Sequence, residues 1–470
     1  MSSKPVLRMA PSPTGQLHVG TARTALFNFL YARHLGATFR MRIEDTDVTR
    51  SKREHADAFC EMLNWMGIDW DDEIVYQSDR FDKYSEAIND LLGKGLAYEC
   101  FETVEELEQI NEERKAKKLP PGYDGRARNL STQQIEEYKQ QGRPRTVRFI
   151  TPDSGTSEFE DAIRGTVSVQ WENVSDFVIE RADRTPTFFL ANAVDDIDMG
   201  ITHVVRGEDL IDSTHRVLAL RKALGSQEQP FYAHTPMILA PDRSKLSKRH
   251  GAVSLESYKQ AGYLPEAVVN YLVLLGWSPQ DGREIVSLEE MISEFDIHNV
   301  NHSGAIFDIK KLEWMNGEYI RSISKDDLVT RIKQDVDNLY PDADPKVVDR
   351  AVELAQPRAT TVNAIIDQMD CLFNRDFSLS EESVEKLKAD ENSINILTHV
   401  KNYLETCQWN IESIDLRELV NSLDLKPRKA LPLVYLAIEN SNTGLPLFDV
   451  IYLIGREKSL DRISKAISSI

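Results

Sequence analysis

Cysteine is scarce in this sequence, which has four among its 470 residues: Cys60, Cys100, Cys371 and Cys407. They form no C-x-x-C pair and have no histidine nearby at ligand spacing, which argues against a disulfide framework and a structural zinc site. Long apolar runs are also missing, because the longest nearly apolar stretch, residues 267–277, is far shorter than the roughly 20 residues that span a bilayer. Residues 1–15 lack the basic and apolar segments of a secretory signal. We therefore expect reduced cysteines, no membrane partner and a cytoplasmic location.

Basic residues are fewer than acidic ones, 56 against 76, and the net charge is −20. Because phosphate binding depends on Lys and Arg, this excess argues against a nucleic-acid partner, but only weakly. A large enzyme can hold RNA on one basic face while being acidic overall, so the positions of the charges matter more than their sum. The length is about three times that of a usual domain and predicts about two to four domains.

Strand and helix patterns alternate in two parts of the chain. The first part has a strand over 6–10, a Pro/Ser/Gly turn and a helix over 21–35. The second has a strand over 202–206, a helix over 213–224 and a short strand over 237–239. This alternation predicts an α/β fold with a Rossmann-like, doubly wound parallel sheet, in which ligands bind beyond the carboxyl ends of the strands.

The segments outside this alternation differ in pattern. Strand-like stretches near 145–150, 166–169 and 177–179 predict an α+β insertion that interrupts the sheet. From residue 324 onward the apolar spacing is helical, as in Leu397, Val400 and Leu404. We therefore expect an all-α C-terminal region.

The turn before the first helix, residues 12–20, is the first candidate site. Its glycines allow the backbone to approach a ligand, and a helix N-terminus attracts phosphate. His18 can donate a hydrogen bond to a phosphate oxygen there. The alternative is a turn that merely connects strand to helix.

The basic loop 242–250 is the second candidate site. Lys245 and Lys248 can hold two ammonium groups against the charge that develops when an α-phosphate is attacked, and Ser247 can bond an oxygen. A solvent-facing loop is the alternative. The two motifs in this order, about 225 residues apart, are far more specific than either alone.

The pairing of residues 11–21, a variant HIGH signature, with Lys245-Leu246-Ser247-Lys248-Arg249, a variant KMSKS signature, resembles the class I aminoacyl-tRNA synthetases. Further motifs narrow the resemblance to the bacterial glutamyl-tRNA synthetases: Arg8-Met9-Ala10-Pro11-Ser12-Pro13-Thr14-Gly15, Arg42-Ile43-Glu44-Asp45-Thr46-Asp47, Tyr123-Asp124-Gly125-Arg126, Val194-Asp195-Asp196, Arg206-Gly207-Glu208-Asp209 and Trp314-Met315-Asn316-Gly317. The matches cover residues 8–317. The helical tail also fits the bacterial form, because glutaminyl and archaeal-type relatives carry β-barrels there.

The resemblance implies that the carboxylate of glutamate attacks the α-phosphate of ATP, bound with Mg²⁺, and that the 3′-terminal ribose of tRNA-Glu then takes the glutamyl group. No covalent enzyme nucleophile is needed, so catalysis rests on positioning and charge stabilisation, which the resemblance assigns to His18, Lys245 and Lys248. It places further residues in the ATP site: Ser12, Thr14, Gly15, Gly20, Thr21, Glu208, Leu239 and Ser247.

The resemblance assigns the side-chain carboxylate of glutamate to Arg8 and Arg206, because an arginine fork binds a carboxylate through two hydrogen bonds. Glu44 would hold the substrate ammonium. Ala10, Ser12, Phe188 and Asn192 would complete the pocket. Phe188 stands where the family commonly has a tyrosine, so one hydroxyl contact with the amino acid is in doubt. Taken singly, Arg8, Glu44 and Arg206 fit an ordinary ion-pair network equally well.

Metal ligation is not expected. Some relatives bind zinc through a C-x-C and C-x-H pair, but the matching positions here are Cys100, Glu102, Ala127 and Asn129, and one thiolate cannot hold structural zinc. Asp195 and Asp196 are interpreted as an acidic turn rather than a metal pair, since no further ligands converge on them in the sequence.

The resemblance also divides the chain into regions: residues 1–100 and 191–252 as the two halves of the catalytic domain, 101–190 as an insertion for the tRNA acceptor end, 253–323 as a stem-contact region and 324–470 as an anticodon-binding region. We expect Arg126, Arg358 and Arg428 to contact tRNA and the protein to be a monomer. Arg358 hints at specificity for tRNA-Glu. Two alternatives stay open: a non-discriminating enzyme that also charges tRNA-Gln with glutamate, and a catalytically silent tRNA-binding module.

Overall fold

The computed structural model describes residues 4–13, 15–47, 50–118, 122–247, 254–374 and 377–470. Two predicted site residues, Thr14 and Lys248, lie outside these ranges. The chain divides into two compact units, Met1–Lys259 with Pro265–Ile309 and Gln260–Leu264 with Lys310–Ile470. Among the described helices, none is both long enough and apolar enough to cross a bilayer.

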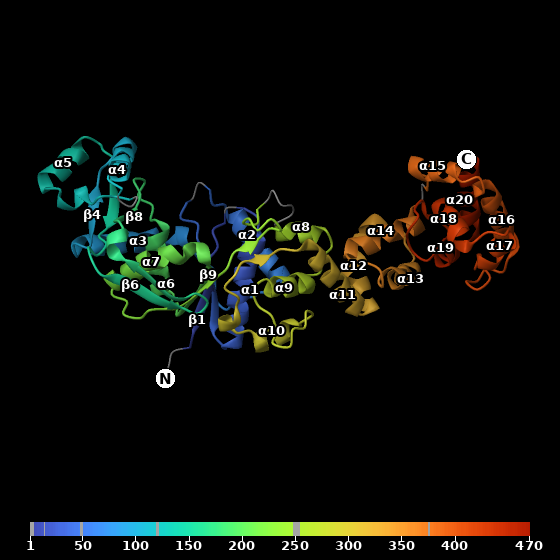
Figure 1. The fold of residues 1–470 in the computed structure, drawn as a ribbon, viewed down its shortest axis with the longest axis horizontal. Coiled ribbons are helices and arrows are strands. Elements are labelled where there is room, and N and C mark those ends of the chain that lie inside the picture. The colour runs from blue at the N-terminus through green and yellow to red at the C-terminus, as the bar shows by residue number, and fades with distance from the viewer. Residues whose placement is uncertain (1–3, 14, 48–49, 119–121, 248–253, 375–376) are drawn as a thin grey trace. The chain divides into compact units, whose positions relative to one another are not determined.

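A seven-stranded sheet with the order β3-β2-β1-β9-β10-β6-β7 forms the centre of the first unit (Figure 1). Its strands are β1 (Val6–Met9), β2 (Thr38–Ile43), β3 (Val75–Tyr76), β6 (Thr156–Asp161), β7 (Gly165–Gln170), β9 (His203–Gly207) and β10 (Phe231–Thr235). All neighbouring strands are parallel except β6 and β7, which form an antiparallel hairpin. The order runs outward from β1 on one side and from β9 on the other, which confirms the predicted doubly wound, Rossmann-like fold.

Helix α1 (Val19–His34) follows β1 and packs both on the sheet and on helices α9 (Pro265–Leu274) and α10 (Leu288–Glu294). Most of its side chains are buried because it is covered on both sides, and Ala22, Leu26 and Phe27 are fully buried. The helix predicted over 21–35 is confirmed, but it begins two residues earlier, at Val19, with His18 as its N-cap. Two further helices of this unit are α2 (Arg53–Trp65) and α8 (Leu255–Gln260).

An antiparallel three-stranded sheet, β4 (Ala97–Cys100), β5 (Thr146–Phe149) and β8 (Phe177–Glu180), lies in the middle of the sequence together with α4 (Val104–Ala116) and α5 (Thr132–Gln140). Helices α3 (Phe81–Gly93), α6 (Phe188–Asp198) and α7 (Ile211–Ala223) share an apolar core with this sheet. The β6–β7 hairpin belongs to the main sheet instead, because Asp161 of β6 pairs with Tyr232 of β10.

The strand predicted over 237–239 is not part of the main sheet. It forms β11 (Ile238–Leu239), which pairs with β12 (Ala305–Ile306), while β10 is the main-sheet strand in this region. Pro236 separates β10 from β11 and has no N–H to donate, so the ladder of the main sheet stops before it.

All the regular secondary structure described in the second unit is helical. Its helices are α11 (Ile309–Ser322), α12 (Lys325–Leu339), α13 (Pro345–Ala355), α14 (Val362–Phe373), α15 (Glu381–Ala389), α16 (Ser393–Thr406), α17 (Arg417–Ser422), α18 (Pro427–Glu439), α19 (Leu447–Ile454) and α20 (Arg456–Ser469). Leu397, Val400 and Leu404 are fully buried on α16, which packs on α18 and α20, so the helical spacing read from the sequence is confirmed.

Candidate active site

A cavity of about 700 Å³ opens where the strand order reverses between β1 and β9. Its walls come from residues 8–12 at the end of β1, from the first turns of α1, from residues 205–207 and 209–210 at the end of β9 and from residues 235–238 at the end of β10. A doubly wound sheet places its ligand at this point, because the two connections leave the sheet in opposite directions there. The cavity gathers most of the predicted site residues: Arg8, Ala10, Ser12, His18, Gly20, Thr21, Glu44, Phe188, Arg206, Lys245 and Ser247.

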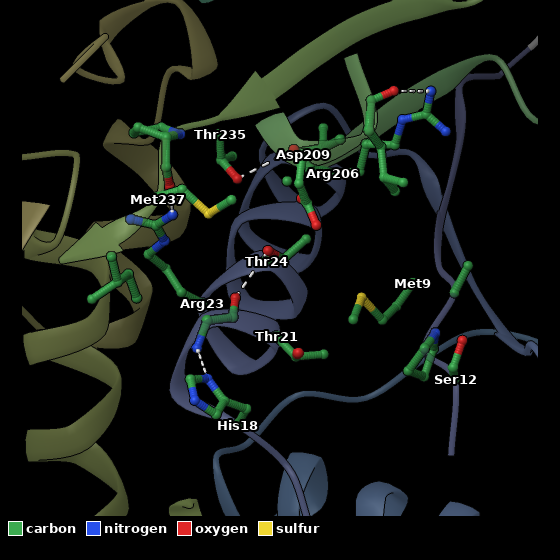
Figure 2. Close-up of a pocket in the computed structure, with 18 of the residues that line it drawn as sticks. Met9, Ser12, His18, Thr21, Arg23, Thr24, Arg206, Asp209, Thr235 and Met237 are labelled. Atoms are coloured by element: carbon green, nitrogen blue, oxygen red, sulfur yellow. Dashed lines mark hydrogen bonds between the residues drawn. The ribbon is translucent and has the colours of Figure 1, made fainter. Parts of the chain in front are cut away.

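The N-terminus of α1 forms one side of the cavity (Figure 2). Nδ1 of His18 accepts a hydrogen bond from the backbone N–H of Gly20 at 3.3 Å, so the proton of a neutral imidazole is on Nε2. Thr21 and Thr24 lie on the next turns, and the Thr24 hydroxyl donates to the Gly20 carbonyl at 3.0 Å. A helix start with open N–H groups and an imidazole is suited to binding phosphate.

Lys245, Leu246 and Ser247 close the cavity from the side of β11. Lys245 forms an isolated bridge with Leu239, so the beginning of the basic loop is attached to the strand that precedes it. The side chain of Lys245 is exposed and can therefore contact a ligand that enters from solvent.

A buried ion-pair network holds the opposite end of the cavity. Asp196 Oδ1 accepts hydrogen bonds from Arg8 Nε at 3.2 Å and from Arg42 Nη1 at 2.6 Å. Arg42 Nη2 donates to Oε1 of Glu44 at 3.0 Å, and the Asn192 amide donates to the same oxygen at 3.4 Å. Burial alone would raise the pKa of Asp196, but the charges of Arg8 and Arg42 outweigh it and hold that pKa below its ordinary value. The network fixes Arg8 and Glu44 at the cavity wall.

Arg206 differs from the other arginines at this end because its hydrogen-bond partners are all neutral. Its Nε donates to Nε2 of His234 at 3.1 Å, and its Nη2 donates to the Thr214 hydroxyl at 2.7 Å. No carboxylate among the described residues is within ion-pair distance of it, although it is only 5% exposed. Burial lowers the pKa of Arg206 to about 10, so it remains a cation at neutral pH.

Four predicted site residues do not line the cavity. The carboxylate of Glu208 accepts hydrogen bonds from the Met237 N–H and from Arg164, and the Leu239 side chain lies against Gly304. Asn192 is buried behind Glu44, and Gly15 lies in the same turn as His18 without lining the cavity. Glu208 and Asn192 therefore contact the cavity wall rather than the cavity.

Arg23 and Asp209 line the cavity and were missed in the sequence (Figure 2). Arg23 is buried and donates to the carbonyls of Leu275, at 2.7 Å, and Pro236. Its burial lowers its pKa to about 10. In the sequence, the position of Arg23 among the alanines of this helix could have indicated its burial, and Asp209 directly follows the predicted Glu208.

The interpretation of Asp195 and Asp196 as an acidic turn was wrong, because both lie in helix α6 and are buried. Asp195 accepts hydrogen bonds from Arg80 Nε at 2.8 Å and from the Tyr84 hydroxyl at 2.9 Å. Two adjacent carboxylates are tolerated inside the protein because arginines surround them.

Cys100 and Glu102, two of the four residues at the positions of the zinc pattern, are hydrogen-bonded to each other. The thiol of Cys100 donates to Oε2 of Glu102 at 2.6 Å, the Tyr123 hydroxyl donates to Oε1, and Arg148 donates to the sulfur at 3.3 Å. In the described part of the chain, no group of three or more His, Cys, Asp or Glu is arranged to hold a metal ion.

The residues predicted to contact tRNA lie outside the cavity. Arg126 is paired with Asp124 at 2.8 Å and with Glu113 at 3.5 Å. Arg358 and Arg428 are exposed, on the segment after α13 and at the start of α18. Their side chains form no ion pair with any described residue and can therefore bind phosphate without first breaking one.

Comparison with known proteins gives consistent matches over the whole chain. The family model "tRNA synthetases class I (E and Q), catalytic domain" matches residues 5–314, and the model "Anticodon binding domain" matches residues 321–467. Glutamate–tRNA ligase 2 of Thermoanaerobacter pseudethanolicus is 41% identical over 99% of this chain and 98% of its own. The glutamate–tRNA ligase of Aquifex aeolicus is also 41% identical, over all of both chains. The crystal structure of a glutamate tRNA ligase from Elizabethkingia meningosepticum, in complex with its amino acid, aligns with a TM-score of 0.85 at 31% identity over 99% of both chains.

Proposed function

This chain belongs to the class I tRNA synthetases of the glutamate and glutamine type, and we propose that it is a glutamate–tRNA ligase that activates L-glutamate with ATP and transfers it to tRNA-Glu. ATP is used as its Mg²⁺ complex. The protein acts as a monomer in the cytoplasm and needs no structural zinc.

The charge of Arg206 is the observation that supports glutamate as the substrate. Arg8 already shares Asp196 with Arg42, whereas Arg206 has no described carboxylate partner. Nη1 of Arg206 makes no hydrogen bond with a described residue, and the residue lines the cavity. A buried cation is costly unless an anion pairs with it, so the side-chain carboxylate of glutamate is the matched ligand and the neutral amide of glutamine is not.

Glu44 provides the complementary contact for the substrate ammonium. Its Oε1 is engaged by Arg42 and Asn192, while its Oε2 accepts no hydrogen bond from a described residue. The residue lines the same cavity as Arg206. A glutamate molecule with its ammonium at Glu44 and its side-chain carboxylate at Arg8 and Arg206 is held through both of its charged ends. Ala10, Ser12 and Phe188 enclose it.

The activation step requires the α-carboxylate of glutamate to attack the α-phosphate of ATP, with loss of pyrophosphate. His18 and the open N–H groups of α1 bind phosphate oxygens and orient them. Lys245 and Lys248 stabilise the charge that develops on the phosphoryl group, with Ser247 bonding an oxygen. Gly20 and Thr21 line the ATP end of the cavity, and Glu208 supports Met237 at its edge. The protein supplies position and charge, and no covalent intermediate with the enzyme forms.

The division of the chain follows the same proposal. Residues 1–100 and 191–252 carry the catalytic site, 101–190 receive the acceptor end, 253–323 contact the stem and 324–470 read the anticodon. Arg126, Arg358 and Arg428 bind the RNA. The exposed Arg358 and Arg428, which have no described ion-pair partner, support this for the helical unit.

Aminoacylation of purified tRNA-Glu and tRNA-Gln, each with labelled glutamate or glutamine, ATP and Mg²⁺, tests the proposed function. We expect glutamate on tRNA-Glu and no glutamine on either RNA. Glutamate on both RNAs would identify a non-discriminating enzyme and would show that Arg358 does not exclude tRNA-Gln. Failure to charge either RNA would contradict the ligase and favour the silent module.

Replacing Lys245 with alanine should lower the rate of glutamyl-adenylate formation about 100-fold, the usual effect of removing one group that stabilises transition-state charge. The Kd for tRNA should change little, since this lysine acts on ATP. Single-turnover aminoacylation and filter binding measure the two quantities. Lys94→Ala, which removes an exposed lysine paired with Asp90, is the control. An unchanged rate of adenylate formation would mean that the loop 242–250 faces solvent and takes no part in the reaction.

A further inference from the structure

Two buried residues behind Arg206 form a hydrogen-bonded chain that the proposed reaction does not use. His234 of β10 accepts from Arg206 Nε at 3.1 Å through Nε2, and its Nδ1 lies 2.7 Å from Oδ2 of Asp161. The side chains of His234 and Asp161 are fully buried, and neither residue lines the cavity. They therefore contact Arg206 without contacting a ligand.

The donor and acceptor roles along this chain are fixed by arginine. A guanidinium N–H can only donate, so Nε2 of His234 must accept and the imidazole proton must be on Nδ1, where it donates to Asp161. Burial lowers the pKa of His234, which keeps the ring neutral and able to accept. Asp161 is itself held by the backbone N–H groups of Ile163 and Arg164, at 3.0 and 2.9 Å from Oδ1.

The imidazole also separates a cation from an anion. Asp161 lies on the far side of His234 from Arg206, so the two charges do not form a direct ion pair. With Nε held by His234 and Nη2 held by Thr214, the guanidinium is fixed and Nη1 is left for the cavity. Without the ring, Arg206 would have a buried, unsatisfied Nε–H and a carboxylate behind it toward which to turn.

We propose that Asp161 and His234 are positioning residues that hold Arg206 toward the cavity and keep its charge available for the side-chain carboxylate of the substrate. This inference rests on the proposed function and adds to it the source of the preference for a carboxylate over an amide. This chain of hydrogen bonds begins at Asp161, the last residue of β6, so the β6–β7 hairpin supports the amino-acid pocket through β10.

Steady-state aminoacylation with saturating tRNA-Glu tests the proposal in two variants of the full-length protein. His234→Leu removes both hydrogen bonds and should raise KM for glutamate about 10- to 100-fold, the effect of losing a hydrogen bond to a charged group, while KM for ATP stays within about threefold. The ratio of kcat/KM for glutamate to that for glutamine should fall with it. His234→Gln keeps an acceptor near the position of Nε2 and should recover most of the lost glutamate affinity.

His215→Leu is the matched control. His215 is also a buried histidine packed on Phe159 and bonded to the hairpin, through Ser157 Oγ at 2.9 Å, but it does not contact Arg206. We expect a lower Tm from this variant and an unchanged KM for glutamate. Equal rises in both KM values for His234→Leu, or no recovery in His234→Gln, would overturn the positioning role. A wild-type protein that charges no tRNA with glutamate would contradict the proposed function and this inference together, whereas an active wild type with unaffected variants would contradict this inference alone.

Discussion

Replacing Arg206 with glutamine should lower kcat/KM for glutamate about 100- to 1,000-fold, mainly through KM. Truncating one partner of a buried charge pair costs about 2–5 kcal/mol, and each 1.4 kcal/mol is a factor of about ten. The loss is large because Arg206 is the cation at this end that has no described carboxylate partner of its own. Aminoacylation kinetics at varied glutamate and saturating ATP measure it.

The same substitution should reduce the discrimination against glutamine, because a neutral pocket no longer leaves a buried charge unpaired when an amide binds. Arg216→Gln is the control, since Arg216 is a half-buried arginine of α7 that packs on Phe177 and Phe189 and does not line the cavity. An Arg206→Gln enzyme with a normal KM for glutamate would contradict the assignment of this arginine to the substrate carboxylate.

Replacing Asp196 with asparagine should lower the free energy of unfolding of the catalytic unit by about 3–5 kcal/mol, the cost of leaving a buried charge without its partner. Asp196 is the shared acceptor of Arg8 and Arg42, both almost fully buried, and an amide cannot balance their charges. Urea unfolding followed by circular dichroism measures the change. KM for glutamate should rise in the folded variant as well, because Arg8 loses the carboxylate that orients it.

Asp198→Asn separates this effect from a general sensitivity of helix α6. Asp198 lies on the same helix two residues later and pairs with Arg80 and Lys83, but its side chain is 42% exposed, against 3% for Asp196. We expect a loss of about 1 kcal/mol or less, as for other surface ion pairs. Equal losses from the two variants would mean that the burial of Asp196 gives it no special role.

The sequence predicted the part of the site that follows strand ends. Glu44 and Arg206 lie near the carboxyl ends of β2 and β9, and parallel strands bring such ends to one edge, whereas Arg8 near the end of β1 was assigned by the family resemblance. The existence of α1 was predicted from the Pro/Ser/Gly turn before it, although its start at Val19 lies two residues before the predicted one.

What the sequence did not predict depends on pairing across long distances. Nothing local shows that the β6–β7 hairpin joins β10 rather than the inserted sheet, and therefore nothing local brings Asp161 to His234. The pairing of Asp195 and Asp196 with arginines was missed for the same reason, because Arg42 and Arg80 lie more than a hundred residues earlier. Adjacent acidic residues are interpreted as an exposed turn when the distant arginines that pair with them are not known.

The central position of β1 has a consequence for how the protein is made. β1 pairs with β2 soon after synthesis, but its other edge must wait for β9, whose neighbour Thr202 bonds Val6 across 196 residues of sequence. At a synthesis rate of about 5–20 residues per second, this edge stays open for roughly 10–40 seconds. Because an unpaired strand edge can pair with other chains, we expect the nascent protein to be most prone to aggregation before the second half of its sheet emerges.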